Sequence, residues 1–158
     1  MAIKSLTTNY VGRTKDISIN RGINPRLLPV QPVNLAFGRV SQFCTGVQKL
    51  VQRYMISFLT ALGSQEDFPT FGTSFLLRLN QGGVTTSDIQ HLFNFANMSV
   101  GKTFKDYDKL NTVPLDEQLY SASLVSVNVT ASSVSLSIKL VCMAGETVDF
   151  VLPLPSEN

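Results

Sequence analysis

The chain contains few of the residues that most often carry enzyme chemistry, and it has no segment suited to crossing a membrane. Its 158 residues include one histidine and two cysteines, and only 15% of them are charged. No apolar run approaches the roughly 20 residues that a membrane-spanning helix requires. Residues 1–10 also lack the hydrophobic centre of a signal peptide. We therefore expect a protein that is synthesised in the cytoplasm and does not enter a membrane.

Catalytic and metal-binding motifs are missing as well. The chain has no phosphate-binding GxxxxGK[ST] loop, no GxSxG elbow, no HExxH and no CxxC. His91 has no second histidine, cysteine or carboxylate at ligand spacing, which favours a surface or boundary role over a metal or general-base role. Glu66 and Asp67 are adjacent on a turn, so their carboxyls diverge instead of facing each other across a substrate. We therefore expect no enzyme activity, no cofactor and no metal.

The two cysteines lie within apolar patterns. Cys44 falls on the apolar face of a predicted helix, and Cys142 ends an apolar strand pattern. A chain of 158 residues is long enough to form one core without a disulfide or metal. Since a free cysteine behaves as a small apolar residue, we predict two buried thiols and no disulfide.

Charge is distributed unevenly along the chain. Residues 1–53 contain eight lysines and arginines and one acid, whereas residues 110–158 contain one lysine and five acids. The basic residues are spaced singly and have no aromatic stacking pattern among them, which argues against nucleic-acid binding. The asymmetry favours a protein interface or a solvated surface.

Residues 40–79 are the most strongly patterned part of the chain. Apolar residues recur there at helical spacing, which predicts a long helix with one broad buried face. They are Val40, Phe43, Cys44, Val47, Leu50, Val51, Tyr54, Met55, Phe58, Leu59 and Leu62. The opposite face suits solvent or a polar partner. It carries Gln42, Gln48, Lys49, Gln52 and Arg53. Gly63 is placed to end this helix in the left-handed conformation.

Two further helices are predicted. After an acidic turn, Phe68 and Phe71 are expected to pin the turn to the core, and Thr73 or Ser74 caps a short helix of Phe75, Leu76, Leu77 and Leu79. A third helix is predicted from about Ser87 to Met98, with a capping box of Ser87 and Gln90. Its apolar stripe is Ile89, Leu92, Phe93, Ala96 and Val100, and Gly101 disfavours a simple continuation.

From Leu119 onward, apolar residues alternate with polar ones, as in strands. Three strands are predicted, with Val125, Val127 and Val129 on the apolar side of the first. Short connections favour an antiparallel meander with one face covered by helices. Pro153 and Pro155 stop the last strand.

Residues 1–37 contain several prolines and glycines and are predicted to form an extended arm in front of a single domain, residues 38–158. Asp16–Asn20 alternates like a strand, and it packs either on its own domain or, as we favour, as an arm on another subunit. The sequence therefore predicts an α+β fold. In that fold two to three helices pack on one face of a C-terminal antiparallel β-meander.

The motif between the first two helices and the order of the elements resemble the baseplate wedge proteins of contractile phage tails. This family is also called the sheath initiators and was once labelled lysozyme-like. A Leu-Thr pair, a Pro-Gly-Glu or Leu-Gly-Ser turn, a proline and Phe-Gly-(Thr/Ser/Cys) recur in it. The matching positions are Leu59, Thr60, Leu62, Gly63, Ser64, Pro69, Phe71, Gly72 and Thr73. The chain lacks the Glu-Pro-Arg tripeptide that helps to hold the wedge core together in many members.

The resemblance implies a structural, non-enzymatic virion protein of the tail baseplate. Its expected partners are the tail sheath protein, the tail tube and the baseplate wedge proteins, with six copies around the tail axis and no nucleic acid or membrane. The C-terminal sheet would offer strand edges to sheath subunits, so that the sheath starts to assemble in register. The alternatives are a cell-wall hydrolase of the baseplate and another tail or neck adaptor.

Two regions are predicted to make these contacts. The basic arm is expected to bind the tube or wedge proteins, and the open edges of the sheet are expected to bind the sheath. The candidate interface residues are Arg13, Lys15, Ile17, Ile19 and Arg21 in the arm, and Val134, Leu136, Ile138, Leu140, Val148, Phe150 and Leu152 in the sheet.

Overall fold

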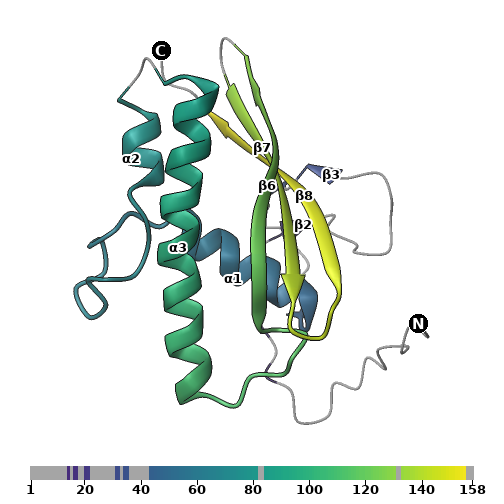
Figure 1. The fold of residues 1–158 in the computed structure, drawn as a ribbon. Helices are drawn as coiled ribbons and strands as arrows, with labels where there is room; N and C mark the ends of the chain where they lie inside the picture. The colour runs from purple at the N-terminus through teal and green to yellow at the C-terminus, as the bar shows by residue number, and fades with distance from the viewer. Residues whose placement is uncertain are drawn as a thin grey trace.

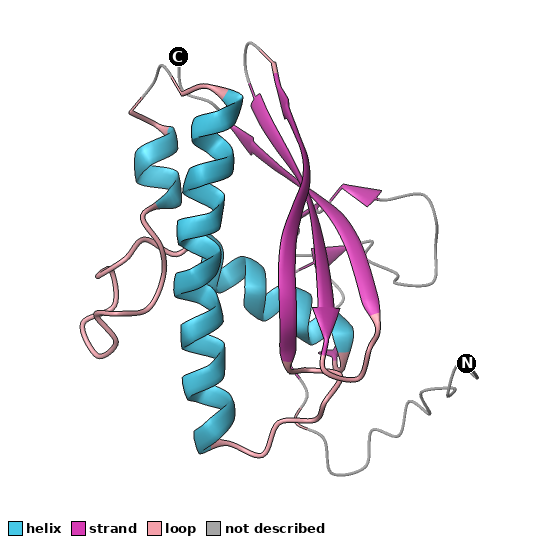
Figure 2. Cartoon of the chain, viewed as in Figure 1, coloured by secondary structure: helices cyan, strands magenta, loops and turns pink. Residues whose placement is uncertain are grey.

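The protein is an α+β fold, as predicted, in which helices lie against one face of a twisted sheet (Figure 1). Figure 2 separates the helical layer from the strands by colour. In this computed structural model, the residues described are 14, 16–17, 20–21, 31–32, 34–35, 43–81, 84–130 and 133–155.

The sheet is built mainly from the three C-terminal strands. β6 (Leu119–Val129), β7 (Ser133–Cys142) and β8 (Thr147–Pro155) run antiparallel in chain order, which confirms the predicted meander. The short strand β3 (Gln31–Pro32) joins β8 in parallel orientation, so the order across the sheet is β3-β8-β7-β6. β7 is therefore an inner strand, and β6 forms one end of the described sheet.

The other N-terminal strands pair within the same chain. β1 (Asp16–Ile17) is antiparallel to β5 (Phe43–Cys44), and β2 (Asn20–Arg21) is antiparallel to β4 (Asn34–Leu35). Of the two alternatives for the Asp16 strand, packing on its own domain is the one observed. Most of the predicted arm lies outside the described residues.

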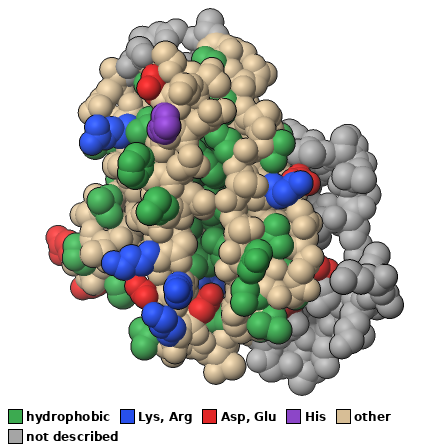
Figure 3. Space-filling model, viewed as in Figure 1, with side chains coloured by type: hydrophobic (Ala, Val, Ile, Leu, Met, Phe, Trp, Pro, Cys, Tyr) green, Lys and Arg blue, Asp and Glu red, His purple; other side chains and the backbone are tan. Residues whose placement is uncertain are grey.

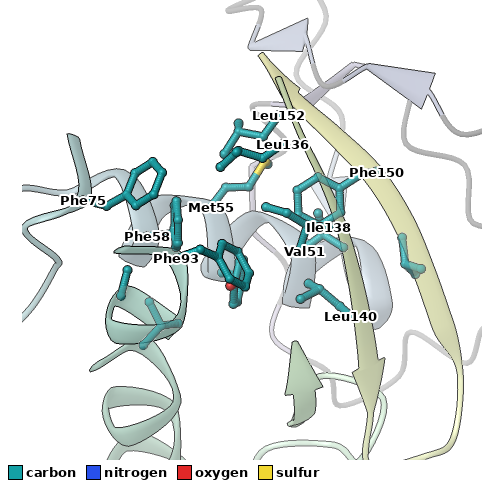
Figure 4. Close-up of a cluster of buried hydrophobic side chains, with 14 of the residues drawn as sticks. Val51, Met55, Phe58, Phe75, Phe93, Leu136, Ile138, Leu140, Phe150 and Leu152 are labelled. Atoms are coloured by element: carbon teal, nitrogen blue, oxygen red, sulfur yellow. The ribbon is translucent and has the colours of Figure 1, made fainter. Parts of the chain in front are cut away.

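The core forms where α1 (Val47–Leu59) crosses the inner face of the sheet. Figure 4 shows Val51 and Met55 of α1 beside a group of apolar side chains from β7 and β8. This group contains Leu136, Ile138, Leu140, Phe150 and Leu152, all of them buried. Burying a side chain of this size contributes about 1.5–3 kcal/mol, so the apolar face of the meander stabilises the fold substantially.

α1 is also buried on its other side, against the two remaining helices. The Phe58 ring lies 4.7 Å from the Phe75 ring in α2 (Phe75–Leu79) and 5.5 Å from the Phe93 ring in α3 (Thr86–Leu110), measured between centroids. These distances are in the favourable range for aromatic pairs. α1 is therefore enclosed between the sheet and the α2–α3 pair.

α1 is shorter than the predicted helix at both ends. Gly46 has a φ of 62°, and the two residues of β5 before it are extended because they pair with β1. Phe43 is consequently exposed, not part of a buried helical face. Gly63 does adopt the left-handed conformation, with a φ of 78°, but the helix has already ended at Leu59. Val40 and Gln42 lie outside the described residues.

α3 is longer than predicted and begins differently. Its N-cap is Thr85, whose side chain forms a capping box with Asp88, so the predicted box of Ser87 and Gln90 is wrong. The helix continues through Gly101 because tertiary packing of the stripe outweighs the modest helix penalty of one glycine. The predicted stripe is confirmed, and it extends to the buried Phe104.

β6 differs from its predicted alternation because it contains two bulges. Tyr120 and Val125 are extra residues that have no partner on β7, and each shifts the register by one. A one-residue shift moves the following side chains to the other face of the sheet. Val125 is therefore 61% exposed, while Ala122 and Leu124 are the residues that pack against the core.

The two cysteines are free and buried, as predicted. The aromatic turn between α1 and α2 is only partly as predicted, because Phe71 is half-buried whereas Phe68 is exposed. His91 is exposed on α3, which confirms its surface position.

The chain makes a close crossing at Gly72, directly before α2. Thr73 N–H donates to the carbonyl oxygen of Thr60 (2.8 Å), and the Thr73 hydroxyl donates to the carbonyl of Phe58 (2.7 Å). Gly72 has a φ of 97°, and a Cβ at this position would lie 2.5 Å from the Thr60 carbonyl oxygen. Only glycine fits this crossing, which ties α2 to the end of α1.

The substitution Gly72→Ala is expected to lower the free energy of unfolding by at least about 2 kcal/mol, because it combines a positive φ with a steric clash. Gly101→Ala is the matched control. A Cβ at Gly101 meets nothing within 4 Å, and the change is expected to raise stability by up to about 1 kcal/mol by removing a helical glycine. Urea denaturation followed by circular dichroism measures both. Equal midpoints for the two variants would contradict this account of Gly72.

Candidate protein-interaction edge

The apolar sheet residues that were predicted to contact a partner all face the core of this chain. They are Val134, Leu136, Ile138, Leu140, Val148, Phe150 and Leu152, and each is at most 3% exposed. β7 is also paired on both sides, with β6 and with β8. The prediction that β7 offers an open edge is therefore wrong, because the strand order places it inside the sheet.

The candidate residues of the arm are mostly outside the described residues. Arg13, Lys15 and Ile19 are not described, and of Arg21 only the backbone is described, in β2. Ile17 is exposed next to β5. Its contact with a partner stays a prediction.

Backbone groups of an antiparallel strand point alternately to its two sides, and two bonds establish the phase in this sheet. Thr130 N–H donates to the Ser133 carbonyl (2.8 Å), and Cys142 N–H donates to the Glu146 carbonyl (2.9 Å). Together with the register, these bonds show that the backbone N–H and C=O groups of odd-numbered β7 residues point toward β6. Those of even-numbered β7 residues point toward β8. The same pattern gives the backbone groups of β6 and β8 that point away from β7.

The outer side of β8 is largely closed to another strand. Pro153 and Pro155 pair with odd-numbered residues of β7, so their nitrogens point away from the sheet. A proline has no N–H to offer there, which is the usual reason for proline on an edge strand. β3 already occupies the same side at Phe150 and Val151. This closure applies to the strand that carries the predicted contacts at Val148 and Leu152.

The outer side of β6 is the more open edge. By the same alternation, Ala122, Leu124, Val127 and Val129 direct their backbone groups away from β7. None of the strands in the described part of the chain lies beyond β6. α3 satisfies one of these groups, because the Asn97 side-chain amide donates to the Ala122 carbonyl (3.0 Å).

The two bulges divide β6 into short regular stretches. In the stretch Ser121–Leu124, the outward carbonyl of Ala122 is already bonded to the Asn97 amide nitrogen. The Asn97 amide oxygen in turn accepts a hydrogen bond from the Tyr54 hydroxyl (3.2 Å). Ser126–Val129 pairs regularly with β7, and no other strand of the described ranges pairs with its outward groups. Bulges are a common way of restricting an edge strand. We call Ser126–Val129 the β6 edge segment.

A buried carboxylate holds the chain together behind this sheet. Glu117 is 1% exposed, and its side chain accepts a hydrogen bond from Gly46 N–H (3.0 Å) at the start of α1. Its second oxygen lies 3.0 Å from the Lys49 ammonium, which also contacts the Thr14 hydroxyl (2.6 Å). A negative charge is favourable at a helix N-terminus. Glu117 therefore acts as a cap for α1 from a distant part of the chain.

Arg53 makes a second link between α1 and the end of α3. Its guanidinium donates to the Glu117 carbonyl (3.2 Å), lies 3.4 Å from the Asp108 carboxylate and stacks on the Phe104 and Tyr107 rings. Burial raises the pKa of Asp108, and the positive charge of Arg53 opposes that shift. The face of α1 that was predicted to suit solvent or a polar partner thus binds polar groups of other elements through Lys49 and Arg53.

Gln52 is buried because it bonds to the N-terminal strands, so of the two predicted environments, solvent or a polar partner, it has the second. Its amide nitrogen donates to the Ile17 carbonyl (2.8 Å) and to the Asp16 carboxylate (3.3 Å). The Cys44 thiol donates to the Gln52 side-chain oxygen (3.7 Å). Burial, with a smaller contribution from Asp16, raises the pKa of Cys44 to about 11.

These polar groups bind one another. In the described ranges, no cluster of three or more His, Cys, Asp or Glu side chains could hold a metal ion. Glu66 and Asp67 are both exposed on the turn between α1 and α2. Among the described helices, none is long and apolar enough to cross a membrane.

Comparison of the chain with protein-family models, with curated proteins and with solved structures finds no match. The resemblance at residues 40–80 therefore depends on the sequence pattern alone. The contacts of Glu117, Arg53 and Gln52 and the β6 edge segment are features of the structure of this chain and do not depend on that resemblance.

Replacing Glu117 by glutamine tests the buried carboxylate. Glu117→Gln keeps an acceptor for Gly46 N–H but leaves the Lys49 ammonium beside a neutral group, and we expect a loss of about 3 kcal/mol in the free energy of unfolding. Glu66→Gln, on the exposed turn, is the control and should change stability by less than about 0.5 kcal/mol. Chemical denaturation at neutral pH measures both. Similar small losses would show that Glu117 is dispensable.

Thiol labelling tests the packing of β5 against α1. At about pH 8, near the pKa of an ordinary thiol, Cys44 should react with a disulfide reagent far more slowly than a free cysteine. The physical reasons are its burial and its raised pKa. Both cysteines should react at once in guanidinium chloride, and mass spectrometry of digested protein identifies the modified residue. Rapid labelling of Cys44 in the folded chain would contradict the structure.

Proposed function

We propose that this chain is a structural protein of a contractile phage tail baseplate, which starts sheath assembly by accepting a strand of a sheath subunit. The observation that carries the proposal is the open β6 edge segment, because on the other side of the meander β3 and two prolines largely close the outer side of β8. Addition of a strand to an exposed sheet edge is a common mode of protein recognition.

The geometry of the β6 edge segment suits this mode. Val127 and Val129 both point their N–H and C=O groups outward and are two residues apart, which is the repeat of an antiparallel ladder. An exposed strand edge is an aggregation hazard, which an assembled partner would remove. Because only four residues of β6 are regular there, the partner strand should be short.

Four of the nine residues that carry the family resemblance help to build the fold of this chain. Thr60, Gly72 and Thr73 form the close crossing between α1 and α2, and Leu59 packs against the core. These positions have an architectural role in this chain. Partner binding is then a task for exposed surfaces, such as the β6 edge segment.

Proline substitution on β6 tests the proposal. Val129→Pro removes an outward N–H but no bond to β7, so the chain should remain folded while strand addition fails. Binding of the purified variant to the tail sheath protein should weaken by at least about tenfold, since a ladder bond is lost and the proline ring crowds the incoming strand. Sheath co-sedimentation or titration calorimetry measures the affinity.

Val129→Ala is the matched control, because it shortens the side chain and keeps the backbone donor. It should bind the sheath protein within about threefold of the unchanged chain, since backbone bonds carry the contact. The proposal fails if Val129→Pro and Val129→Ala bind equally well. It also fails if cryo-electron microscopy of tails places the chain away from the first sheath ring.

A further inference from the structure

The turn between α1 and α2 presents an aromatic side chain to solvent. Residues 61–70 are all exposed, and Phe68 near their end is 65% exposed although it was predicted to pack on the core. Glu66 and Asp67 precede it directly. Phe68 is one of several large apolar side chains that the described part of the chain exposes, and it lies directly after two exposed acids.

This turn is held in a defined conformation. Ser64 N–H donates to the Ala61 carbonyl (3.1 Å), Phe68 N–H to the Gln65 carbonyl (3.2 Å) and Phe71 N–H to the Phe68 carbonyl (2.9 Å). The crossing at Gly72 anchors its end. A preorganised turn loses little conformational entropy on binding, which favours a role in recognition. We call residues 64–69 the acidic-aromatic turn.

The outward face of α3 carries a complementary stripe. Its members follow each other at spacings of four and three residues, which is the spacing of one helix face. They are His91, Phe95, Met98, Lys102, Lys105 and Lys109, and all are exposed. We call them the α3 stripe. Phe95 and Met98, each 72% exposed, make its N-terminal half largely apolar, and its C-terminal half is basic.

The basic half of the α3 stripe is available for an acidic partner. Among the described residues, Lys102 and Lys105 have no ion-pair partner, whereas Lys109 lies 3.6 Å from Asp106. Figure 3 shows hydrophobic and basic side chains on the face that α3 presents to the viewer, with acidic side chains among the basic ones. An apolar pair followed by lysines matches an aromatic residue next to two carboxylates in both polarity and charge.

We propose that the acidic-aromatic turn of one copy docks on the α3 stripe of a second copy. Phe68 would cover Phe95 and Met98, while Glu66 and Asp67 face Lys102 and Lys105. The two surfaces differ, so the contact is head-to-tail and each copy in a pair keeps one surface free for a further copy. Such contacts form a ring if the rotation closes and a filament if it does not.

This inference is independent of the proposed sheath contact. Self-association through the turn and α3 uses none of the outward groups of the β6 edge segment. A chain that binds the sheath protein but stays monomeric would overturn only the self-association. A chain that self-associates but ignores the sheath protein would overturn only the sheath contact.

Sedimentation velocity of the purified full chain tests the proposal directly. The average mass should rise above that of the monomer as the concentration is raised from micromolar to near millimolar at low salt. It should return toward the monomer in about 1 M salt, where the screening length falls to about 3 Å. A chain that remains monomeric at the highest concentration in low salt would overturn the proposal.

Charge reversal identifies the two surfaces. The double variant Glu66→Lys with Asp67→Lys, and the double variant Lys102→Glu with Lys105→Glu, should each weaken self-association by at least about tenfold. The chain that carries all four changes should associate again, because its charges are complementary once more. All these side chains are exposed, so the variants should unfold at unchanged temperatures. Failure of the fourfold variant to associate would overturn the pairing.

Mixing the two double variants provides a further test of the pairing. Within each variant the turn and the stripe carry charge of the same sign, so like chains repel each other at this contact. Between unlike chains, the acidic turn of one meets the lysines of the other, and the reversed turn meets the reversed stripe. An equal mixture should therefore associate although neither variant does so alone, and a mixture that stays monomeric would overturn the pairing.

Removal of the aromatic ring tests the apolar half of the contact. Phe68→Ser should weaken association because Phe95 and Met98 then stay exposed to water in the complex. Asp149→Lys on β8 is the control, since it changes a charge on the sheet and should leave association unchanged. Equal effects of Phe68→Ser and Asp149→Lys would overturn the docking mode.

Discussion

The buried carboxylate of Glu117 is the interaction on which the arrangement of this chain depends. Gly46 and Val47 at the start of α1 are buried, so the Gly46 N–H needs a hydrogen-bond acceptor within the chain. Glu117 accepts from Gly46 and pairs with Lys49, and Arg53 binds the Glu117 carbonyl. One residue thereby joins the start of α1 to the segment that leads into β6, and the hydrophobic layers are positioned around it.

Local patterns predicted most of the fold, and long-range contacts explain the rest. Apolar periodicity predicted the meander and the buried apolar face of α3, because periodicity depends only on residues that are close in sequence. It placed the start of α1 too early, since the extended form of Phe43 depends on pairing with β1. Glu117 was missed because its partner Gly46 is 71 residues away. The available sign was the lack of an acid in the first turn of α1.

The candidate edge was harder to predict than the strands themselves. Alternation identifies which side chains are buried, but it does not reveal which strand lies outermost. The strand order depends on β3 joining β8. The direction in which the backbone groups of β6 point depends on the hydrogen-bond pattern that starts at Thr130. The bulges at Tyr120 and Val125 then decide which part of β6 stays regular. Each of these features combines residues that are distant in sequence, so the predicted edge was assigned to the wrong strands.

The acidic-aromatic turn and the α3 stripe are fixed relative to each other by the crossing at Gly72. The turn leaves the end of α1 and returns at Thr73, while the Ser99 hydroxyl of α3 donates to the Gly72 carbonyl (3.2 Å). A rigid angle between two complementary surfaces is what determines whether head-to-tail contacts close into a ring. The same crossing carries the motif that resembles the baseplate wedge family. Gly72 is therefore required at this crossing to fix the angle between the two surfaces, and not to contact a partner directly.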